Sequence, residues 1–471
     1  MNLKIYDSMA REAVPFEPRE PGKVNMYVCG PTVYDYIHIG NARPVIFFDV
    51  VRRYLESIGL QVNYIVNFTD VDDKMIRKAN ELGITVPELA EKFIAAFNED
   101  RDGLGARRPT VAPRVTETIP EIVAFIQGLV DKGAAYENGG DVYFRTGSFP
   151  DYGKLSHKNL DELQYGIRID VDERKENPQD FVLWKAAKPG EIHWPSPWGD
   201  GRPGWHIECS AMVQKFAGDT LDIHGGGHDL QFPHHECEIA QSESLTGEPL
   251  SRYWMHNGFV NINNEKMSKS LGNGVNVRQL LKKTSRYAIR YLMLATHYRS
   301  PLNFSDETIR QAESSVERLT NSRDNVKHRL STVAQGSLAL PGDEALRARL
   351  DELRTSFRER MDDDFSTPDA ITAWFGLVTE ANAYLKKEAV SESDLLLLLE
   401  RIGEMDAVLG LLPAQADDGG LLDEEVDALI AERTAARANR NFKRADEIRD
   451  LLAGRGIALE DTPQGIRWKR K

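Results

Sequence analysis

Cysteine is scarce in this sequence, since only Cys29, Cys209 and Cys237 occur in 471 residues. A count this low and odd argues against a disulfide framework and indicates a reducing compartment. No apolar run approaches the roughly 20 residues of a membrane-spanning helix. Residues 1–7 also lack the apolar core of a signal peptide. We therefore expect a cytoplasmic protein that makes no contact with membranes.

An excess of positive charge is also missing. The formal net charge is −14, which argues against non-specific binding to nucleic acid but leaves room for a local basic surface. The composition, 41% hydrophobic and 28% charged, is typical of a globular protein. The length predicts about three domains.

The N-terminal part alternates strand and helix patterns. We predict strands at 24–29 and 62–68, and helices at 41–58, 72–82 and 87–102. This order predicts a doubly wound α/β domain with a parallel sheet. Residues 134–144 read as a hairpin with an Asn-Gly turn, inside an insertion at about 115–203. A further strand is predicted near 253–261. From residue 306 the sequence is helical, with an apolar stripe at Leu346, Leu350, Leu353 and Phe357.

Residues 222–243 carry the first chemical pattern. A short strand, residues 221–223, leads into Gly225–Gly227, which let a backbone approach a ligand. Pro233 suits the first turn of a helix, and His234 and Glu238 then stand at i and i+4 on one face. That pair can supply half of a tetrahedral zinc site, which Cys29 and Cys209 can complete. Cys237, at i+3 from His234, gives an equally plausible set of three cysteines and one histidine.

Two further patterns suit a nucleotide. Residues 34–41 lie between the first strand and the first helix, where phosphates bind in such folds. There His38 can donate a hydrogen bond to a phosphate oxygen, and Gly40 lets the backbone approach the phosphate. Lys266-Met-Ser-Lys-Ser270 places two lysines three residues apart, so that they can bracket the charge of a departing pyrophosphate.

Together these motifs resemble those of the class I aminoacyl-tRNA synthetases. Four stretches resemble the cysteinyl-tRNA synthetase family in particular: residues 29–35, 204–210, 225–241 and 456–468. The resemblance runs nearly from end to end. It implies a Rossmann-type catalytic domain with an inserted connective peptide, a helical bundle and a small anticodon-binding domain. The implied boundaries are 1–114 and 204–262 for the catalytic halves, 115–203 for the insertion, 263–305 for the loop and stem-contact region, 306–412 for the bundle and 421–471 for the anticodon-binding domain.

The resemblance also implies site residues. It selects Cys29, Cys209, His234 and Glu238 as ligands of one Zn²⁺ per subunit, which decides between the two ligand sets. The implied catalytic residues are His38, Asn41, Lys266 and Lys269. The implied ATP contacts are His38, Gly40, Asn41, Gly226, Asp229, Lys266, Ser268 and Lys269. The implied contacts to L-cysteine are Cys29, Thr69, Trp205 and His234. The chain departs from the family at Cys237, where Asn is usual, and at Asn41, where a second His is usual.

The implied reaction has two steps. The cysteine carboxylate attacks the α-phosphorus of ATP, which is bound with Mg²⁺, and a ribose hydroxyl at the 3′ end of tRNA(Cys) then takes the cysteinyl group. Because sulfur and oxygen differ too little for an apolar pocket to separate cysteine from serine, we expect zinc to select the substrate thiol, with no editing site. We expect the protein to act as a monomer. At the C-terminus, residues 467–470, Arg-Trp-Lys-Arg, have side chains suited to stacking on anticodon bases.

Three other functions would account for part of these patterns. A ligase that joins cysteine to an aminoglycoside through the same adenylate would share the zinc and ATP motifs but lack the C-terminal unit. A non-enzymatic tRNA-binding relative would have lost His38 or the 266–270 motif. A zinc hydrolase would favour His-Glu-x-x-His, which the His234/Glu238 spacing does not provide.

Overall fold

The structure is a computed structural model that describes residues 2–158, 173–266, 274–333, 340–413, 423–454, 457–462 and 465–470. The chain divides into two compact units, which are described separately. Unit 1 contains residues 1–316, 355–373 and 405–411, and unit 2 contains residues 317–354, 374–404 and 412–471. No helix in the described part of the chain has the length and apolar character needed to cross a bilayer.

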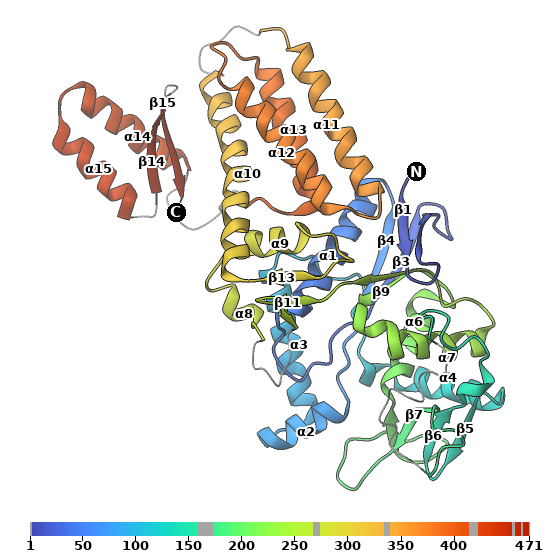
Figure 1. Cartoon of the computed structure of the whole chain (residues 1–471). Coiled ribbons are helices and arrows are strands. Elements are labelled where there is room, and N and C mark those ends of the chain that lie inside the picture. The colour runs from blue at the N-terminus through green and yellow to red at the C-terminus, as the bar shows by residue number, and fades with distance from the viewer. Residues whose placement is uncertain are drawn as a thin grey trace. The chain divides into compact units, whose positions relative to one another are not determined.

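A four-stranded parallel sheet organises unit 1 (Figure 1). Its strands, in the order β10-β9-β3-β4, are Ser251–Asn257, Leu221–Gly227, Lys23–Val28 and Gln61–Val66. All three pairings are parallel. Each strand is buried over most of its length, as is typical of parallel sheets covered by helices. The predicted doubly wound α/β fold is therefore confirmed.

The helices that join these strands begin where the sequence supplies caps. Helix α1, Ile39–Ser57, starts at His38, whose Nδ1 accepts from the Gly40 amide while Asn41 accepts from the His38 amide. Helices α2, Asp73–Leu82, and α3, Val86–Gly103, start at Asp72 and Thr85. The predicted strands and helices of this region agree with the structure to within a few residues.

An antiparallel module interrupts the parallel sheet between β4 and β9. Its strands β5 to β8 are Ala135–Asn138, Asp141–Phe144, Phe181–Ala186 and Gly201–Pro203. Helix α4, Ile119–Asp131, precedes them. The predicted hairpin is confirmed as β5 and β6, but its two turn residues are Gly139 and Gly140, both with positive φ, and Asn138 belongs to β5. The module shares a core with the sheet, in which Trp184, Phe144, Ile207 and Trp254 belong to one buried cluster.

The remaining elements of unit 1 surround the sheet. They are β1 Lys4–Asp7, β2 Glu12–Pro15, α6 Trp205–Ala217, α7 Glu236–Thr246, β11 Val260–Ile262, β12 Glu265–Lys266, α8 Val277–Leu280, α9 Arg286–Leu294 and β13 Leu302–Phe304. The strand predicted near 253–261 is confirmed as β10, but β10 ends at Asn257, and residues 260–262 form the separate strand β11. Gly258 lies between the two strands, and a Cβ on it would lie 2.7 Å from the Ser300 carbonyl oxygen.

The second half of the chain is helical, as predicted. Helices α10 to α13 are Asp306–Val333, Glu344–Asp362, Thr367–Tyr384 and Glu392–Leu409. The predicted apolar stripe lies on α11 and is buried. At the C-terminus, α14 Asp423–Ala438 and α15 Phe442–Gly454 pair with each other and precede the hairpin β14 Ile457–Thr462 and β15 Gly465–Arg470. Val426, Ile448 and Leu452 form its small core.

A buried arginine on helix α9 connects this helix to α1 and to the end of α13. Arg290 is 1% exposed and donates to Asp49 Oδ2 at 3.0 Å and to the Leu409 carbonyl at 2.9 Å. Asp49 is equally buried and also accepts from Arg53. Removing one member of a buried pair leaves an uncompensated charge, which costs far more than the loss of an exposed pair.

We therefore predict that Arg290→Leu lowers the stability of unit 1 by about 3 kcal/mol or more. Calorimetry should show its transition at a lower temperature. Arg108→Leu is the matched control, because its pair with Asp102 is half-exposed and is worth about 1 kcal/mol or less. Equal shifts for the two variants would contradict a structural role for the buried pair.

Candidate functional site

The carboxyl edge of the parallel sheet gathers the predicted metal-binding side chains. Cys29 follows β3 and its amide donates to the Gly225 carbonyl of β9 at 3.2 Å. Cys209 lies on α6, and Glu238 lies in the first turn of α7. His234 lies directly before α7. The backbone is not helical at Phe232 (φ −140°, ψ 132°), and it is helical from Pro233 through His235 into α7. Pro233 therefore stands in the first turn of this helix, as predicted, although the regular α7 begins only at Glu236.

His234 and Glu238 nevertheless meet, with His234 Nε2 3.0 Å from Glu238 Oε1. The two sulfur atoms of Cys29 and Cys209 are 3.9 Å apart, and Cys29 Sγ is 3.5 Å from Glu238 Oε1. Ligand atoms of all four residues lie within 4.8 Å of one another. In a tetrahedral zinc site with Zn–S bonds of about 2.3 Å, two sulfurs stand about 3.8 Å apart. The donor types and their spacing therefore fit zinc.

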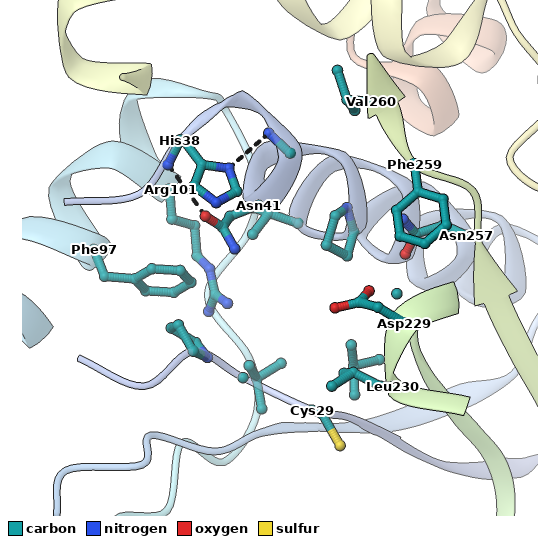
Figure 2. A pocket seen from close by; sticks show the side chains of 18 of the residues that line it. Cys29, His38, Asn41, Phe97, Arg101, Asp229, Leu230, Asn257, Phe259 and Val260 are labelled. Carbon is teal, nitrogen blue, oxygen red and sulfur yellow. Dashed lines mark hydrogen bonds between the residues drawn. The ribbon is translucent and has the colours of Figure 1, made fainter. Parts of the chain in front are cut away.

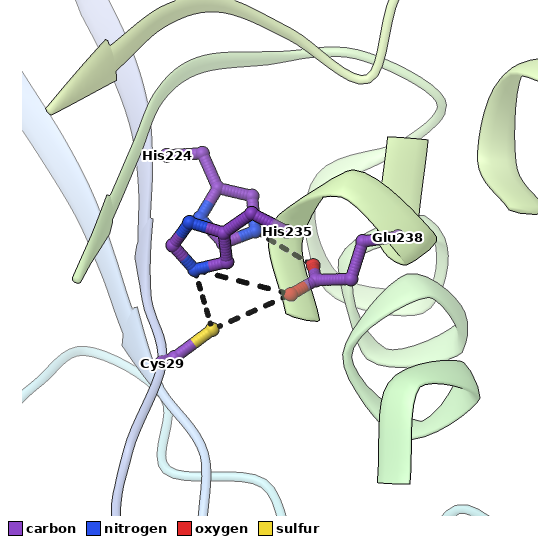
Figure 3. A group of neighbouring side chains, drawn as sticks. All are labelled: Cys29, His224, His235 and Glu238. Atoms are coloured by element: carbon purple, nitrogen blue, oxygen red, sulfur yellow. Dashed lines mark hydrogen bonds and ion pairs between the residues drawn. The ribbon is translucent and has the colours of Figure 1, made fainter. Parts of the chain in front are cut away.

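A second group of four shares two of these residues. Cys29, His224, His235 and Glu238 also bring one donor atom each within 4.8 Å (Figure 3). His224 Nε2 is 2.7 Å from Glu238 Oε2, and His235 Nε2 is 3.3 Å from Cys29 Sγ. This group offers one sulfur where the first offers two, and zinc in proteins favours thiolate ligands. Its histidines are better placed to orient Cys29 and Glu238, as partners of ligands commonly do.

Cys237 takes part in neither group. It is buried, and its sulfur lies 3.2 Å from the Tyr152 hydroxyl. Burial raises its pKa, so it is a weak source of thiolate. The alternative of three cysteines and one histidine receives no support from this arrangement.

The electrostatics of the group separate its two thiols. The hydrogen bond from Cys29 lowers the pKa of Cys209 to about 6, with further help from His234. Burial raises the pKa of Cys29. Burial alone would raise the pKa of Glu238, but His224 and His234 hold it well below its usual range. The Cys209 thiol and the Glu238 carboxyl are therefore the most readily ionised acids of the cluster, as ligands of a cation need to be.

The predicted amino-acid contacts border this cluster. Trp205 is 44% exposed and stacks on the His234 ring with centroids 4.3 Å apart. Thr69 is buried and donates to Glu208 Oε2 at 2.9 Å. Burial raises the pKa of Glu208 well above its usual range.

A pocket of about 680 Å³ opens beside the four candidate metal ligands (Figure 2). Cys29 belongs to its wall, as do the predicted nucleotide residues His38, Gly40, Asn41 and Asp229. Asn41 uses its carbonyl oxygen to hold the His38 amide at 3.2 Å, which leaves its amide nitrogen as a donor. Asn257, which sequence reasoning missed, lines the same pocket with a buried Oδ1 that has no hydrogen-bond partner among the described residues.

Two of the three glycines of β9 differ from their predicted use. A Cβ on Gly225 would lie 2.4 Å from the Phe48 ring, and one on Gly226 would lie 3.0 Å from His235 and Leu230. At these two positions the missing side chain leaves room for neighbouring side chains of the protein itself. Gly227 lines the pocket, whereas Gly226 is not among its lining residues. Ser268 and Lys269 lie outside the described residues, and Lys266 is described only as part of β12.

Comparison with known proteins places this geometry in a family. The family model described as the tRNA synthetases class I (C) catalytic domain matches residues 15–314. The DALR domain matches residues 356–413, and the cysteinyl-tRNA ligase anticodon binding domain matches residues 420–468. The chain is 56% identical over 473 residues to the cysteine–tRNA ligase of Brevibacillus brevis, with 100% of both chains covered.

The chain belongs to the cysteinyl-tRNA synthetase family. A second such ligase, from Halalkalibacterium halodurans, is 55% identical over 470 residues, again with both chains fully covered. Among solved structures, methionyl-tRNA synthetase of Mycobacterium tuberculosis, in complex with methionyl-adenylate, shares the fold at a TM-score of 0.61. That match has 17% identity and covers 83% of this chain and 90% of the other. The predicted family, enzyme class and class I fold are confirmed.

Several residues of this synthetase site escaped the sequence analysis, namely His206, Glu208, His224, His235, Asn257 and Arg101. His224 carried a usable signal, since it stands two residues after Asp222 on a strand and so points to the same face. Arg101 carried none, because an arginine late in a predicted helix is usually exposed.

We predict that Cys209→Ser loses bound zinc, because an alcohol does not supply the thiolate that the site requires. Metal content of the purified protein, measured by atomic emission, should fall from about one to near zero per chain. Cys237→Ala is the control and should keep its zinc, since Cys237 contacts Tyr152. Zinc loss in the control alone would reverse the assignment.

Proposed function

We propose that this protein activates L-cysteine with ATP and transfers the cysteinyl group to the 3′ end of tRNA(Cys). The observation that carries the proposal is the double position of Cys29, which belongs both to the metal-ready group and to the wall of the pocket. An amino acid held at the metal would therefore border the space suited to a nucleotide. The fully covered relatives with this ligase name support the same reaction.

Cys29, Cys209, His234 and Glu238 would hold one zinc ion. When bound, the zinc would supply a Lewis acid that favours a thiolate over an alcohol and so selects cysteine over serine. His224 would keep the Glu238 carboxylate in place through their 2.7 Å contact. His206, whose Nδ1 lies 2.8 Å from Nδ1 of His234, would orient that ring in the same way.

Around the substrate, Trp205 and Thr69 would border the cysteine. The Thr69 hydroxyl is fixed as a donor to Glu208, so its lone pairs can accept a hydrogen bond from a substrate ammonium. Trp205 is exposed enough to close over a ligand while it stacks on His234.

ATP, accompanied by Mg²⁺, would occupy the pocket at the start of α1. The cysteine carboxylate attacks the α-phosphorus and pyrophosphate leaves. His38, Asn41, Lys266 and Lys269 would stabilise the negative charge of this transition state by position and electrostatics. Gly40 and Asp229, which line the pocket, and Ser268 would complete the nucleotide contacts. Gly226 would act indirectly, by leaving room for His235 and Leu230 beside the pocket. A tRNA ribose hydroxyl then attacks the acyl carbon and AMP leaves.

The C-terminal part of the chain would bind the anticodon. Trp468 donates to Asp427 at 2.8 Å and packs on the small core of this region. Its ring therefore supports the hairpin, and base stacking would fall to other exposed groups, such as Phe442, which is 61% exposed. We retain the domain boundaries predicted from the sequence, the monomeric state and the cytoplasmic location as parts of the proposal.

The first test is transfer of labelled cysteine to unfractionated tRNA in the presence of ATP. We expect label on tRNA from cysteine and none from serine. Cysteine-dependent pyrophosphate exchange without transfer to tRNA would instead favour the ligase that joins cysteine to a small amine. Transfer of serine as efficiently as cysteine would refute the selective role of the metal.

We further predict that Lys269→Ala slows adenylate formation at least about a hundredfold, because one transition-state cation is lost. ATP–pyrophosphate exchange measures that rate, and zinc content should stay unchanged. Lys23→Ala removes a half-exposed lysine of the same unit and should exchange at the normal rate. An unchanged rate in Lys269→Ala would refute the assigned role.

A further inference from the structure

Arg101 is a buried cation on the wall of the catalytic pocket, and the proposed mechanism gives it no task. It lies on α3, is 2% exposed and lines the pocket together with Phe97 and Tyr64. Figure 2 shows its side chain on the Phe97 side of the pocket, below His38 and Asn41 and away from Phe259. A charged side chain in such a place is costly unless something pairs with it.

No described residue pairs with it by hydrogen bonding at Nη1, which is fully buried. The carboxylates whose charge acts on Arg101 are those of Asp49 and Asp102. Asp49 is occupied by Arg53 and Arg290, and Asp102 is occupied by Arg108. Phe97 lies under the guanidinium at 4.9 Å and offers only its ring face. Burial lowers the pKa of Arg101, as expected for a cation without a matching counter-charge.

The surroundings of Arg101 suit an anion. Tyr64 is close enough to respond to its charge, and burial raises the pKa of this hydroxyl to about 12, so it remains a donor at neutral pH. Asn41 presents an amide donor at the start of α1 in the same pocket. A guanidinium binds phosphate oxygens through two parallel N–H groups, and a helix start adds further donors.

Helix α3 is also tied to the segment that follows the lysine motif. Arg278 donates to Asp100 Oδ1 at 3.0 Å and to the Ala96 carbonyl at 3.2 Å. Ile39, next to His38, donates to the Val275 carbonyl at 2.8 Å. Asp100, which accepts from Arg278, directly precedes Arg101 on α3. Arg101 therefore lies next to a contact with the segment that follows residues 266–270, where the departing phosphates are proposed to bind.

We propose that Arg101 forms an oxyanion subsite of this pocket and binds the pyrophosphate group of the nucleotide, both as part of ATP and as the leaving product. The subsite rests on the proposed function for the source of its ligand. It makes Arg101 a further binding residue for the first step of the reaction. The same cation would help to retain pyrophosphate until it is released.

The test is direct binding of magnesium pyrophosphate to the full-length zinc-loaded protein, measured by calorimetry without cysteine or tRNA. Arg101→Met, which keeps an unbranched apolar stem but removes the guanidinium and its charge, should bind at least about tenfold more weakly. Arg101→Lys should bind with intermediate strength, because it restores the charge without the two-pronged geometry. Arg349→Met is the control, since its pair with Glu352 is exposed and lies in unit 2, and it should bind as the unmodified protein does.

Thermal unfolding separates a binding role from a structural one. Without ligand, Arg101→Met should unfold at the same temperature as the unmodified protein or higher, because a desolvated charge has been removed. Pyrophosphate should raise the unfolding temperature of the unmodified protein and raise that of Arg101→Met much less. Equal pyrophosphate affinity in the two proteins would overturn the subsite. A lower unfolding temperature with equal weakening of cysteine binding would also overturn it, in favour of a structural cation.

Pyrophosphate binding and tRNA charging, measured on the same variant, separate a failure of the subsite from a failure of the proposed reaction. Normal charging of tRNA with unchanged pyrophosphate binding in Arg101→Met would reject the subsite alone. Arg101-dependent pyrophosphate binding in a protein that charges no tRNA would reject the proposed reaction and keep the subsite.

Discussion

The parallel pairing of β3 with β9 is the constraint on which the site depends. Tyr27 is in register with His224, and Val28 with Gly225, so the next residue, Cys29, leaves the sheet beside the glycines of β9. In a parallel sheet the strands end at one common edge. A slip of one residue would turn Cys29 to the opposite face and separate it from Glu238.

Close packing keeps that register. A Cβ on Gly30 would lie 1.7 Å from the Asn67 carbonyl oxygen, so the ends of β3 and β4 touch backbone to backbone. Arg43 then secures α1 against the far end of β10, since it donates to the Gly258 and Phe259 carbonyls at 2.9 and 3.0 Å. The pocket between these elements is thus bordered by rigid backbone, which suits catalysis that works by position.

Sequence patterns predicted the parallel sheet, because strand and helix periods are short-range features. The i, i+4 spacing of His234 and Glu238 is also local, but it left Cys237 as an alternative ligand. Only the resemblance to the family selected the four candidate ligands that the structure brings together. The helix that follows Pro233 was also predicted from a local signal, although its regular part begins only at Glu236. His235 and Arg101 were missed because their roles depend on burial and on partners distant in the chain. Lys269 stays a prediction, as it lies outside the described residues.

The antiparallel module between β4 and β9 has a consequence for how the protein is made. Cys29 emerges from the ribosome early, whereas Glu238 emerges only when about half of the chain has been synthesised. No local segment holds more than two of the four donors, so closing the site must await the folding of the module and the arrival of β9. Until then, Cys29 has none of the other three candidate ligands beside it. The four side chains can therefore come together only after the first half of this enzyme has been synthesised.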